Sequence, residues 1–270
     1  MTAIVLWHGW GMQPQVWRAL GLRLQQHGFV TRAPALPGYA DAATPDWQQP
    51  AALLDCMLAG IDEPIALCGW SLGAMLAMMA ALDHPEKISH LILCAATPSF
   101  VARTNWPHGI PVPVLAEFGR QVAASPFSAR RNFITLFNQG DQHARRITRD
   151  LIALFQDGSA SIAQQKAQSE TPPEAQTQTP AASLPSLQTL ADGLQLLAQL
   201  DLRHTIKNIR QPCLLLHGAC DPLMPLSAAE WLARQLPNAS LTIVPHAAHA
   251  PFVSDPDYCA AAIARFLDGR

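Results

Sequence analysis

The chain has 270 residues, of which 49% are hydrophobic and 14% are charged, and its formal net charge is −2. This length fits one domain with an insertion, and the apolar content is ample for a core. The near-neutral charge gives no indication of nucleic acid or of an anionic membrane as a partner, so we expect neither.

The N-terminal residues, the longest apolar run and the cysteines indicate the cellular compartment of the protein. The first residues are apolar but lack the basic region and the cleavage site of a signal peptide. The longest helical apolar run, 74–82, is far shorter than the ~20 residues that span a bilayer. The chain has six cysteines and no C-x-x-C pair, so we expect free, buried thiols. We therefore predict a cytoplasmic protein, and we expect a monomer.

The first part of the chain alternates short apolar runs with helical patterns. A predicted strand over 3–7 ends in a glycine turn and is followed by a helical pattern over 14–27. The next predicted elements are a strand at 29–33, a helix at 47–61, a strand at 64–70, a helix at 72–82 and a strand at 88–95. This rhythm predicts an α/β fold, in which helices cover both faces of a mostly parallel sheet.

The alternation stops near Pro98, and residues 105–202 show helical patterns without a convincing strand. The core pattern then resumes with a strand at 213–217, a helix at 226–236, a strand at 241–245 and a helix at 256–267. We therefore expect about six strands and three segments. These are a first core segment at 1–104, a helical cap at 105–202 and a second core segment at 203–270. A cap at this point can cover a site at the carboxyl ends of the strands.

Within the cap, residues 158–183 are rich in Gln, Ala, Ser, Thr and Pro. A segment of this composition cannot bury enough apolar surface to offset its ordering entropy. We therefore expect a flexible loop near 158–183, whose part around 169–182 is mobile and carries no chemistry.

Gly69-Trp70-Ser71-Leu72-Gly73 matches the pattern G-x-S-x-G between an apolar strand and a helix rich in Ala and Met. A serine on a sharp strand-to-helix turn needs small residues two before it and two after it. Ser71 is therefore the candidate nucleophile. The amide of Leu72, at the helix N-terminus, is a candidate donor to an oxyanion. The alternative is a helix N-cap serine without chemistry.

A serine nucleophile needs a base and an acid, which follow it in the order acid, then histidine, in this architecture. Among ten histidines, His249 lies between the last predicted strand and the last helix, and His246 is its nearest rival. Asp221 follows the penultimate strand and would fix the tautomer of His249. The alternatives are that Asp221 is a plain turn residue, or that Asp192 or Asp201 is the acid.

The turn His8-Gly9-Trp10-Gly11 follows the first predicted strand, where a second oxyanion donor is expected. The amide of Trp10 is the candidate, and the loss of one such donor costs on the order of 2.7–4 kcal/mol. The alternative is an ordinary glycine turn. We expect no cofactor and no metal.

Together with the segments 217–221 and 247–252, these motifs resemble the α/β-hydrolase superfamily. The pairing of H-G-W-G with G-W-S-L-G and A-A-H-A-P-F is similar to the carboxylesterase family of biotin synthesis. That family hydrolyses the methyl ester of a pimeloyl chain carried on acyl carrier protein and releases methanol. The resemblance implies a serine esterase whose partner is the acyl carrier protein.

The resemblance also implies contacts with substrate and carrier. The implied substrate contacts are Trp10, Ser71, Leu72, Phe133, Ile134, Thr135, Leu136, Phe137 and His249. The implied contacts with the acidic carrier are Arg130, Arg131, Arg145 and Arg149. Asn132 stands where the family pattern has an arginine.

Two features depart from the superfamily pattern. A leading hairpin is missing before the first predicted strand, and the segment 35–38 lacks the aspartate usual before Leu-Pro-Gly. The same residues are also compatible with other functions. The protein could be a broad short-chain carboxylesterase, a carbon–carbon bond hydrolase with the same triad, or a non-enzymatic small-molecule binder.

Overall fold

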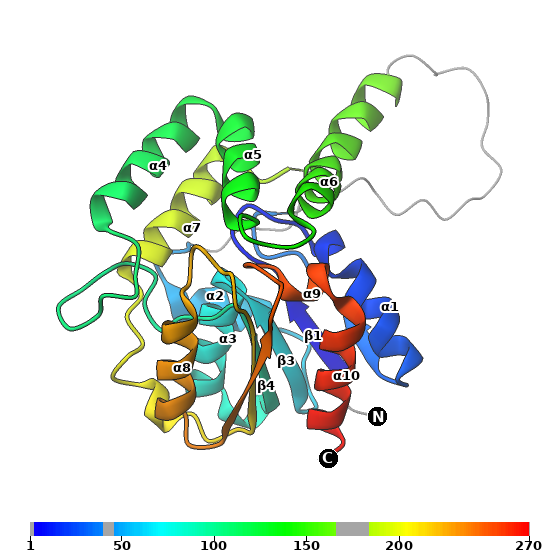
Figure 1. Cartoon of the computed structure of the whole chain (residues 1–270), viewed down its shortest axis with the longest axis vertical. Helices are drawn as coiled ribbons and strands as arrows, with labels where there is room; N and C mark the ends of the chain where they lie inside the picture. The colour runs from blue at the N-terminus through cyan, green and yellow to red at the C-terminus, as the bar shows by residue number, and fades with distance from the viewer. Residues whose placement is uncertain (1–2, 40–45, 166–183, 270) are drawn as a thin grey trace.

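A computed structural model describes residues 3–39, 46–165 and 184–269 of the chain. In these ranges a six-stranded parallel sheet has the order β2-β1-β3-β4-β5-β6 (Figure 1). The strands are β1 (Ala3–Trp7), β2 (Val30–Arg32), β3 (Ile65–Trp70), β4 (Ile88–Cys94), β5 (Cys213–Gly218) and β6 (Ala239–Val244). The predicted α/β fold is confirmed.

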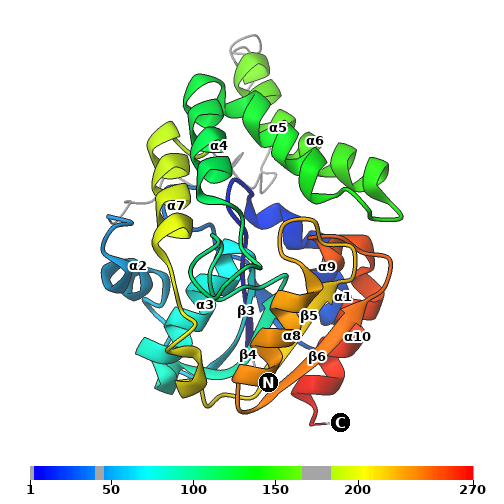
Figure 2. The same ribbon diagram turned by 60° about the vertical axis from the view of Figure 1, so that its left-hand side comes forward.

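Helices cover both faces of the sheet (Figure 2). One face carries α1 (Arg18–Gln26), α9 (Pro251–Ser254) and α10 (Pro256–Leu267), and the other carries α2 (Pro50–Met57), α3 (Leu72–Asp83) and α8 (Leu226–Gln235). Short 3-10 turns are η1 (Pro14–Trp17), η2 (Pro85–Lys87) and η3 (Ile206–Asn208). Because both faces are covered, strands β3 and β5 are buried along their whole length, and His217 is the one polar side chain in them.

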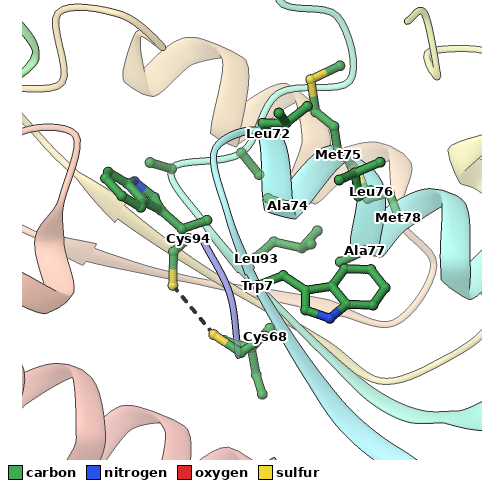
Figure 3. Packing of buried hydrophobic residues seen from close by; sticks show 14 of the residues in the cluster. Trp7, Cys68, Leu72, Ala74, Met75, Leu76, Ala77, Met78, Leu93 and Cys94 are labelled. Carbon is green, nitrogen blue, oxygen red and sulfur yellow. Dashed lines mark hydrogen bonds between the residues drawn. The ribbon is translucent and has the colours of Figure 1, made fainter. Parts of the chain in front are cut away.

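Helix α3 lies at the centre of the core and is buried from Leu72 to Ala81. Figure 3 shows its alanine and methionine side chains packed near Trp7 and Leu93 of the neighbouring strands. A helix that is apolar all round can be stable only when it is surrounded by protein. The core therefore fixes α3, and with it the turn that leads into its first residue.

Four helices between β4 and β5 form a cap over the carboxyl ends of the strands (Figures 1 and 2). They are α4 (Val112–Ala124), α5 (Pro126–Phe137), α6 (Ala144–Gln165) and α7 (Leu187–Gln199). Helix α4 packs against α5 and α7, and α5 packs against α6. The α6 backbone stays helical to Gln165, so α6 extends into the segment near 158–183 where a flexible loop is predicted. The part around 169–182, which is predicted to be mobile, lies outside the described residues.

All six cysteines are free, as predicted, but only four of them are buried. Cys56 of α2 and Cys220, which follows β5, are exposed, whereas Cys68, Cys94 and Cys213 on the strands and Cys259 on α10 are buried. Within the described ranges no helix combines the length and the hydropathy that a membrane span requires.

Candidate active site

Ser71 lies on a tight turn between β3 and α3. Its φ of 58° and ψ of −116° are strained for a residue with a side chain. A Cβ atom on Gly69 would collide with the carbonyl of Gly73, and one on Gly73 would collide with the carbonyl of Trp7. Ser71 occupies the N-cap position of α3, but its side chain makes no capping hydrogen bond. The turn therefore needs both glycines, and the geometry does not favour the simple capping interpretation of Ser71.

Asp221 and His249 form a buried pair at the carboxyl edge of the sheet. His249 Nδ1 lies 2.8 Å from Asp221 Oδ2, and the two residues are 1% and 7% exposed. The other carboxylate oxygen, Oδ1, accepts the amide hydrogens of Leu223 at 2.9 Å and Met224 at 3.0 Å. Asp221 is thus held for contact with His249, with Nδ1 of the imidazole as the donor.

The other candidates make different contacts. Asp192 accepts from Gln188 on the same helix, and Asp201 pairs with Arg203 at 2.7 Å. His246 is exposed, whereas the His249 side chain is buried against Asp221. The geometry therefore favours Asp221 and His249 over these rivals.

Opposing effects set the pKa of Asp221. Burial is the largest influence and favours the protonated carboxyl, but the charge and hydrogen bond of His249 act against it. The charge of His217 and the amide of Met224 act in the same direction as His249, so the pKa of Asp221 is lowered overall. Asp221 is therefore an anion at neutral pH and can stabilise a positive charge on His249.

The backbone of His249 is held from two sides. Its carbonyl accepts a 2.8 Å hydrogen bond from Trp70 Nε1, and its amide donates at 3.3 Å to the carbonyl of Phe137. The rings of Trp70 and Phe137 lie 5.7 and 5.5 Å from the imidazole. His249 Nε2 is buried and has no hydrogen-bond partner among the described residues. That nitrogen is therefore available as a proton acceptor.

Two backbone amides near Ser71 are also available. A Cβ atom on Gly9 would lie 3.2 Å from Ser71 Cβ, which brings the turn after β1 against the serine. Neither the amide of Trp10 nor that of Leu72 donates a hydrogen bond within the described parts of the chain. Two such donors beside a serine can stabilise an oxyanion.

Side chains hold the turn that carries Trp10. His8 Nε2 accepts the amide hydrogen of Leu36 at 3.1 Å, and His8 Nδ1 donates to the carbonyl of Gly9 at 2.9 Å. Burial lowers the pKa of His8 to about 4, so its ring is neutral at pH 7. The amide of Gly11 donates to the hydroxyl of Tyr39 at 2.8 Å. These contacts fix the backbone on both sides of Trp10.

Arg130 does not lie where the family resemblance implies. It is 4% exposed, and its Nε donates at 3.1 Å to the carbonyl of Gly11. Its implied contact with a carrier protein is therefore wrong, because the cap buries its guanidinium against the core. Arg131, Arg145 and Arg149 are exposed, and Arg149 pairs with Asp150 at 2.9 Å.

An apolar cavity of about 420 Å³ lies between the cap and the core. Its lining includes Phe133 and Leu136 of α5, Phe118 of α4 and Leu223. The rings of Phe118 and Phe133 contact the ring of Trp10, with centroids 5.3 and 5.4 Å away. The cavity therefore adjoins both the turn after β1 and the loop that contains Asp221.

The segment 133–137 divides between four environments. Phe133 and Leu136 line the cavity, Ile134 is fully buried, and Phe137 packs against the ring of His249. Thr135 is exposed, and its hydroxyl donates to the carbonyl of Arg131 at 3.0 Å. Two of the implied substrate contacts thus face the cavity.

Three side chains that contact the site are absent from the predicted set. They are Tyr39, Trp70 and Asp141. Trp70 lies inside the G-x-S-x-G motif and could have been considered, but the contacts of Tyr39 and Asp141 are tertiary and have no local sequence signal. Among the described residues, no group of three or more His, Cys, Asp or Glu side chains is arranged to hold a metal ion.

Residues 4–262 match the model of the alpha/beta hydrolase family, and the chain belongs to this family. Among solved structures, an esterase from Exiguobacterium antarcticum aligns with a TM-score of 0.80 at 18% identity over 99% of this chain and 92% of that one. An esterase from Thermogutta terrifontis aligns with a TM-score of 0.74 at 19% identity over 100% of this chain and 90% of that one. These likenesses show the fold.

More similar relatives have one name in common. A pimeloyl-[acyl-carrier protein] methyl ester esterase of Aromatoleum aromaticum is 37% identical over 98% of both chains. A protein of that name from Nitrosomonas europaea is 34% identical over 94% of this chain and 91% of its own length. Another, from Pectobacterium carotovorum, is 32% identical over 95% of this chain and 90% of its own length.

Proposed function

We propose that this chain is a serine carboxylesterase of biotin biosynthesis that hydrolyses the methyl ester of pimeloyl-[acyl-carrier protein]. The products are pimeloyl-[acyl-carrier protein] and methanol. The observation that carries the proposal is the buried Asp221–His249 pair, whose other imidazole nitrogen has no hydrogen-bond partner among the described residues. Trp70, the residue before the strained Ser71, donates a hydrogen bond to the carbonyl of His249 and so joins the two segments. The names of the similar relatives support the substrate.

Ser71 is the nucleophile in this proposal. Its Oγ attacks the ester carbonyl carbon while its proton passes to Nε2 of His249. Asp221 keeps the Nδ1 proton in place and stabilises the imidazolium without accepting that proton. The negative charge that forms on the carbonyl oxygen is stabilised by the amides of Trp10 and Leu72.

The acyl-enzyme then forms and is hydrolysed. The bond to the methoxy group breaks, and the imidazolium of His249 donates its proton to the leaving methanol. A water molecule attacks the acyl-serine with the same histidine as base, which releases the free carboxylate and restores Ser71. No redox step and no second co-reactant besides water are needed for this balance.

The cavity between cap and core is the proposed site for the acyl chain. Its lining is almost entirely apolar, which suits a methylene chain but not a charged group. Phe133 and Leu136 would contact the methylene groups, beside the ring of Trp10. The division into core and cap, with the cap covering this chain, is part of the same proposal.

The exposed face of α6 is the proposed contact for the acidic carrier. Arg145 and Arg149 are one helical turn apart and exposed, and Arg131 of the neighbouring helix α5 is exposed as well. Charge would orient the carrier at the rim while the acyl chain enters the apolar cavity.

A serine-directed fluorophosphonate probe tests the nucleophile. We expect the probe to label the wild type on Ser71, which peptide mass mapping would show. Ser71→Ala should not be labelled, and His249→Ala should be labelled more slowly than the wild type. Equal labelling of Ser71→Ala would contradict the assignment. The substrate is tested by mass spectrometry of the methyl-pimeloyl carrier protein after incubation with the chain.

A further inference from the structure

The cap turn between α5 and α6 lies directly against the loop that carries His249. The carbonyl of Phe137 accepts the amide hydrogen of His249 at 3.3 Å, and the amide of Gln142 donates to the carbonyl of His246 at 3.0 Å. Two main-chain hydrogen bonds thus join the cap to this loop. The position of the histidine depends on the seating of the cap.

Asp141, in the same turn, makes the strongest set of contacts with the loop. Its Oδ2 accepts the amide hydrogen of Ala248 at 3.0 Å, and its Oδ1 accepts the hydroxyl of Ser254 at 3.1 Å. Oδ1 also accepts the amide hydrogen of His143 at 2.7 Å. The residue is buried, so these bonds are little exposed to competing water.

A role in the local turn alone does not account for these contacts. The turn before α6 needs only the bond from the amide of His143, two residues on, which the side chain of Ser, Thr or Asn could also accept. A carboxylate is the side chain that offers two acceptor oxygens at once, and hydrogen bonds to a charged acceptor are about twice as strong as neutral ones. Asp141 uses its second oxygen on Ala248, the residue before His249.

The loop is also confined from the opposite side. A Cβ atom on Gly218 of β5 would collide with the carbonyl of Ala248. Ala248 is thus held between the end of β5 and the carboxylate of Asp141, and it cannot move without breaking one of these contacts. Its neighbour His249 is thereby directed at Asp221.

We propose that Asp141 is a positioning residue for His249. It acts through the backbone of Ala248 and the hydroxyl of Ser254, which hold the loop so that the imidazole meets Asp221. This inference rests on the proposed triad of Ser71, Asp221 and His249. A displacement of about 1 Å in a reacting group can cost about 100-fold in rate, so a loosened loop lowers kcat.

The test compares Asp141→Ala and Asp141→Asn with the wild type in the full-length chain. The substrate is p-nitrophenyl acetate, which needs no carrier and little of the acyl cavity. We expect kcat to fall roughly 10- to 100-fold in Asp141→Ala and less in Asp141→Asn, with KM changed by less than about twofold. Asp150→Asn, which changes an exposed carboxylate on α6, is the matched control and keeps wild-type kinetics.

A proton NMR measurement separates positioning from general loosening. The Nδ1 proton shared by His249 and Asp221 should give a low-field resonance in the wild type, and it should broaden or vanish in both Asp141 variants. Ser254→Ala retains the hydrogen bond from the amide of Ala248 to Asp141. This variant should therefore keep most of the wild-type kcat and the low-field resonance. Asp141→Asn is nearly isosteric, so it provides the test if Asp141→Ala does not fold.

Wild-type kcat and an unchanged low-field resonance in Asp141→Asn would overturn the positioning role. A failure of the triad itself would look different, because Ser71→Ala and His249→Ala would then retain activity. A fall in kcat together with loss of the resonance, in variants that keep the wild-type circular dichroism spectrum, would support the inference.

Discussion

Arg130 Nε donates a 3.1 Å hydrogen bond to the carbonyl oxygen of Gly11, which joins cap helix α5 to the turn after β1. The amide of Gly11 is bound to the hydroxyl of Tyr39 at 2.8 Å, so both polar groups of this residue are held by side chains. Trp10 directly precedes Gly11. The proposed oxyanion donor therefore depends on a residue of the cap, as the proposed base depends on Asp141.

The first prediction concerns Arg130. Arg130→Met should lower kcat roughly tenfold or more on p-nitrophenyl acetate and on the carrier-bound ester alike, because the carbonyl of Gly11 loses its donor and the amide of Trp10 shifts. Steady-state kinetics on both substrates would measure this. Arg131→Met changes the exposed neighbouring residue and is the control, so its kcat on p-nitrophenyl acetate should equal that of the wild type. If kcat or KM changed only for the carrier-bound ester, the result would instead indicate that Arg130 contacts the carrier protein.

The second prediction concerns the turn at Ser71. Gly73→Ala should destabilise the fold by at least about 3 kcal/mol, because the added methyl meets the backbone of Trp7, which cannot rotate away. Gly119→Ala on α4 is the matched change, since a Cβ there meets nothing within 4 Å. It should stabilise its helix by up to about 1 kcal/mol. Urea unfolding of the two variants checks both values, and similar midpoints would contradict the close contact.

The third prediction concerns the acid. Asp221→Asn should reduce kcat by about 10⁴-fold, because the amide favours the wrong tautomer of His249. Asp201→Asn should leave kcat nearly unchanged, since Asp201 is paired with Arg203. The opposite pattern would transfer the acid role to Asp201.

The fourth prediction concerns stability at acid pH. His8 must be neutral in the fold, because its Nε2 accepts a hydrogen bond, and its pKa is lowered to about 4 by burial. The unfolded chain binds this proton near pH 6.5. The contribution of His8 is therefore complete above about pH 6.5, and it is lost as the pH falls toward 4, by about 3 kcal/mol in total.

Urea unfolding of the wild type and His8→Gln between pH 4 and 8 measures this contribution. The free energy of unfolding of the wild type should decline more steeply below pH 6.5 than that of the variant. Parallel curves would show that the buried imidazole does not control the pH dependence.

The fifth prediction concerns the carrier. The double change Arg145→Glu with Arg149→Glu should raise KM for the carrier-bound ester and leave p-nitrophenyl acetate nearly untouched. The difference should shrink with added salt, since exposed charges are screened over about 10 Å at 0.1 M. Arg234→Glu with Arg265→Glu makes the same charge change on exposed core helices and should have little effect. Equal KM values of the two double variants for the carrier-bound ester would contradict the proposal that the carrier binds α6.

The sequence predicted the parallel sheet because most of its strands are short apolar runs bounded by turn residues, although β2 has the sequence Val-Thr-Arg. The strand order and the side chains that meet across the site could not be predicted, since both depend on tertiary contacts. Ser71 was predicted from a motif that reflects local backbone needs, and His249 from its place between the last strand and the last helix. Asp141 lies 107 residues from Ala248, whose amide it accepts, and nothing in its own segment signals this contact.

Arg130 shows the limit of transfer by resemblance. The cap pattern implied an exposed cation, but α5 presents this position toward the core, where burial lowers its pKa to about 10 and leaves it charged. Helix periodicity alone does not say which face of a cap helix meets the core when the helix carries polar residues on both sides. The composition of the segment near 158–183 likewise did not reveal that α6 extends to Gln165.

Ser71 is the residue that we propose hydrolyses the methyl ester of a pimeloyl chain on acyl carrier protein. Intact-protein mass spectrometry of methyl-pimeloyl carrier protein, incubated with the wild type or with Ser71→Ala, tests this proposal most directly. We predict that the wild type lowers the mass of the carrier species by one methylene group, as the methyl ester becomes a carboxylate, while Ser71→Ala leaves it unchanged. An intact carrier ester after incubation with a wild-type chain that hydrolyses p-nitrophenyl acetate would contradict the account.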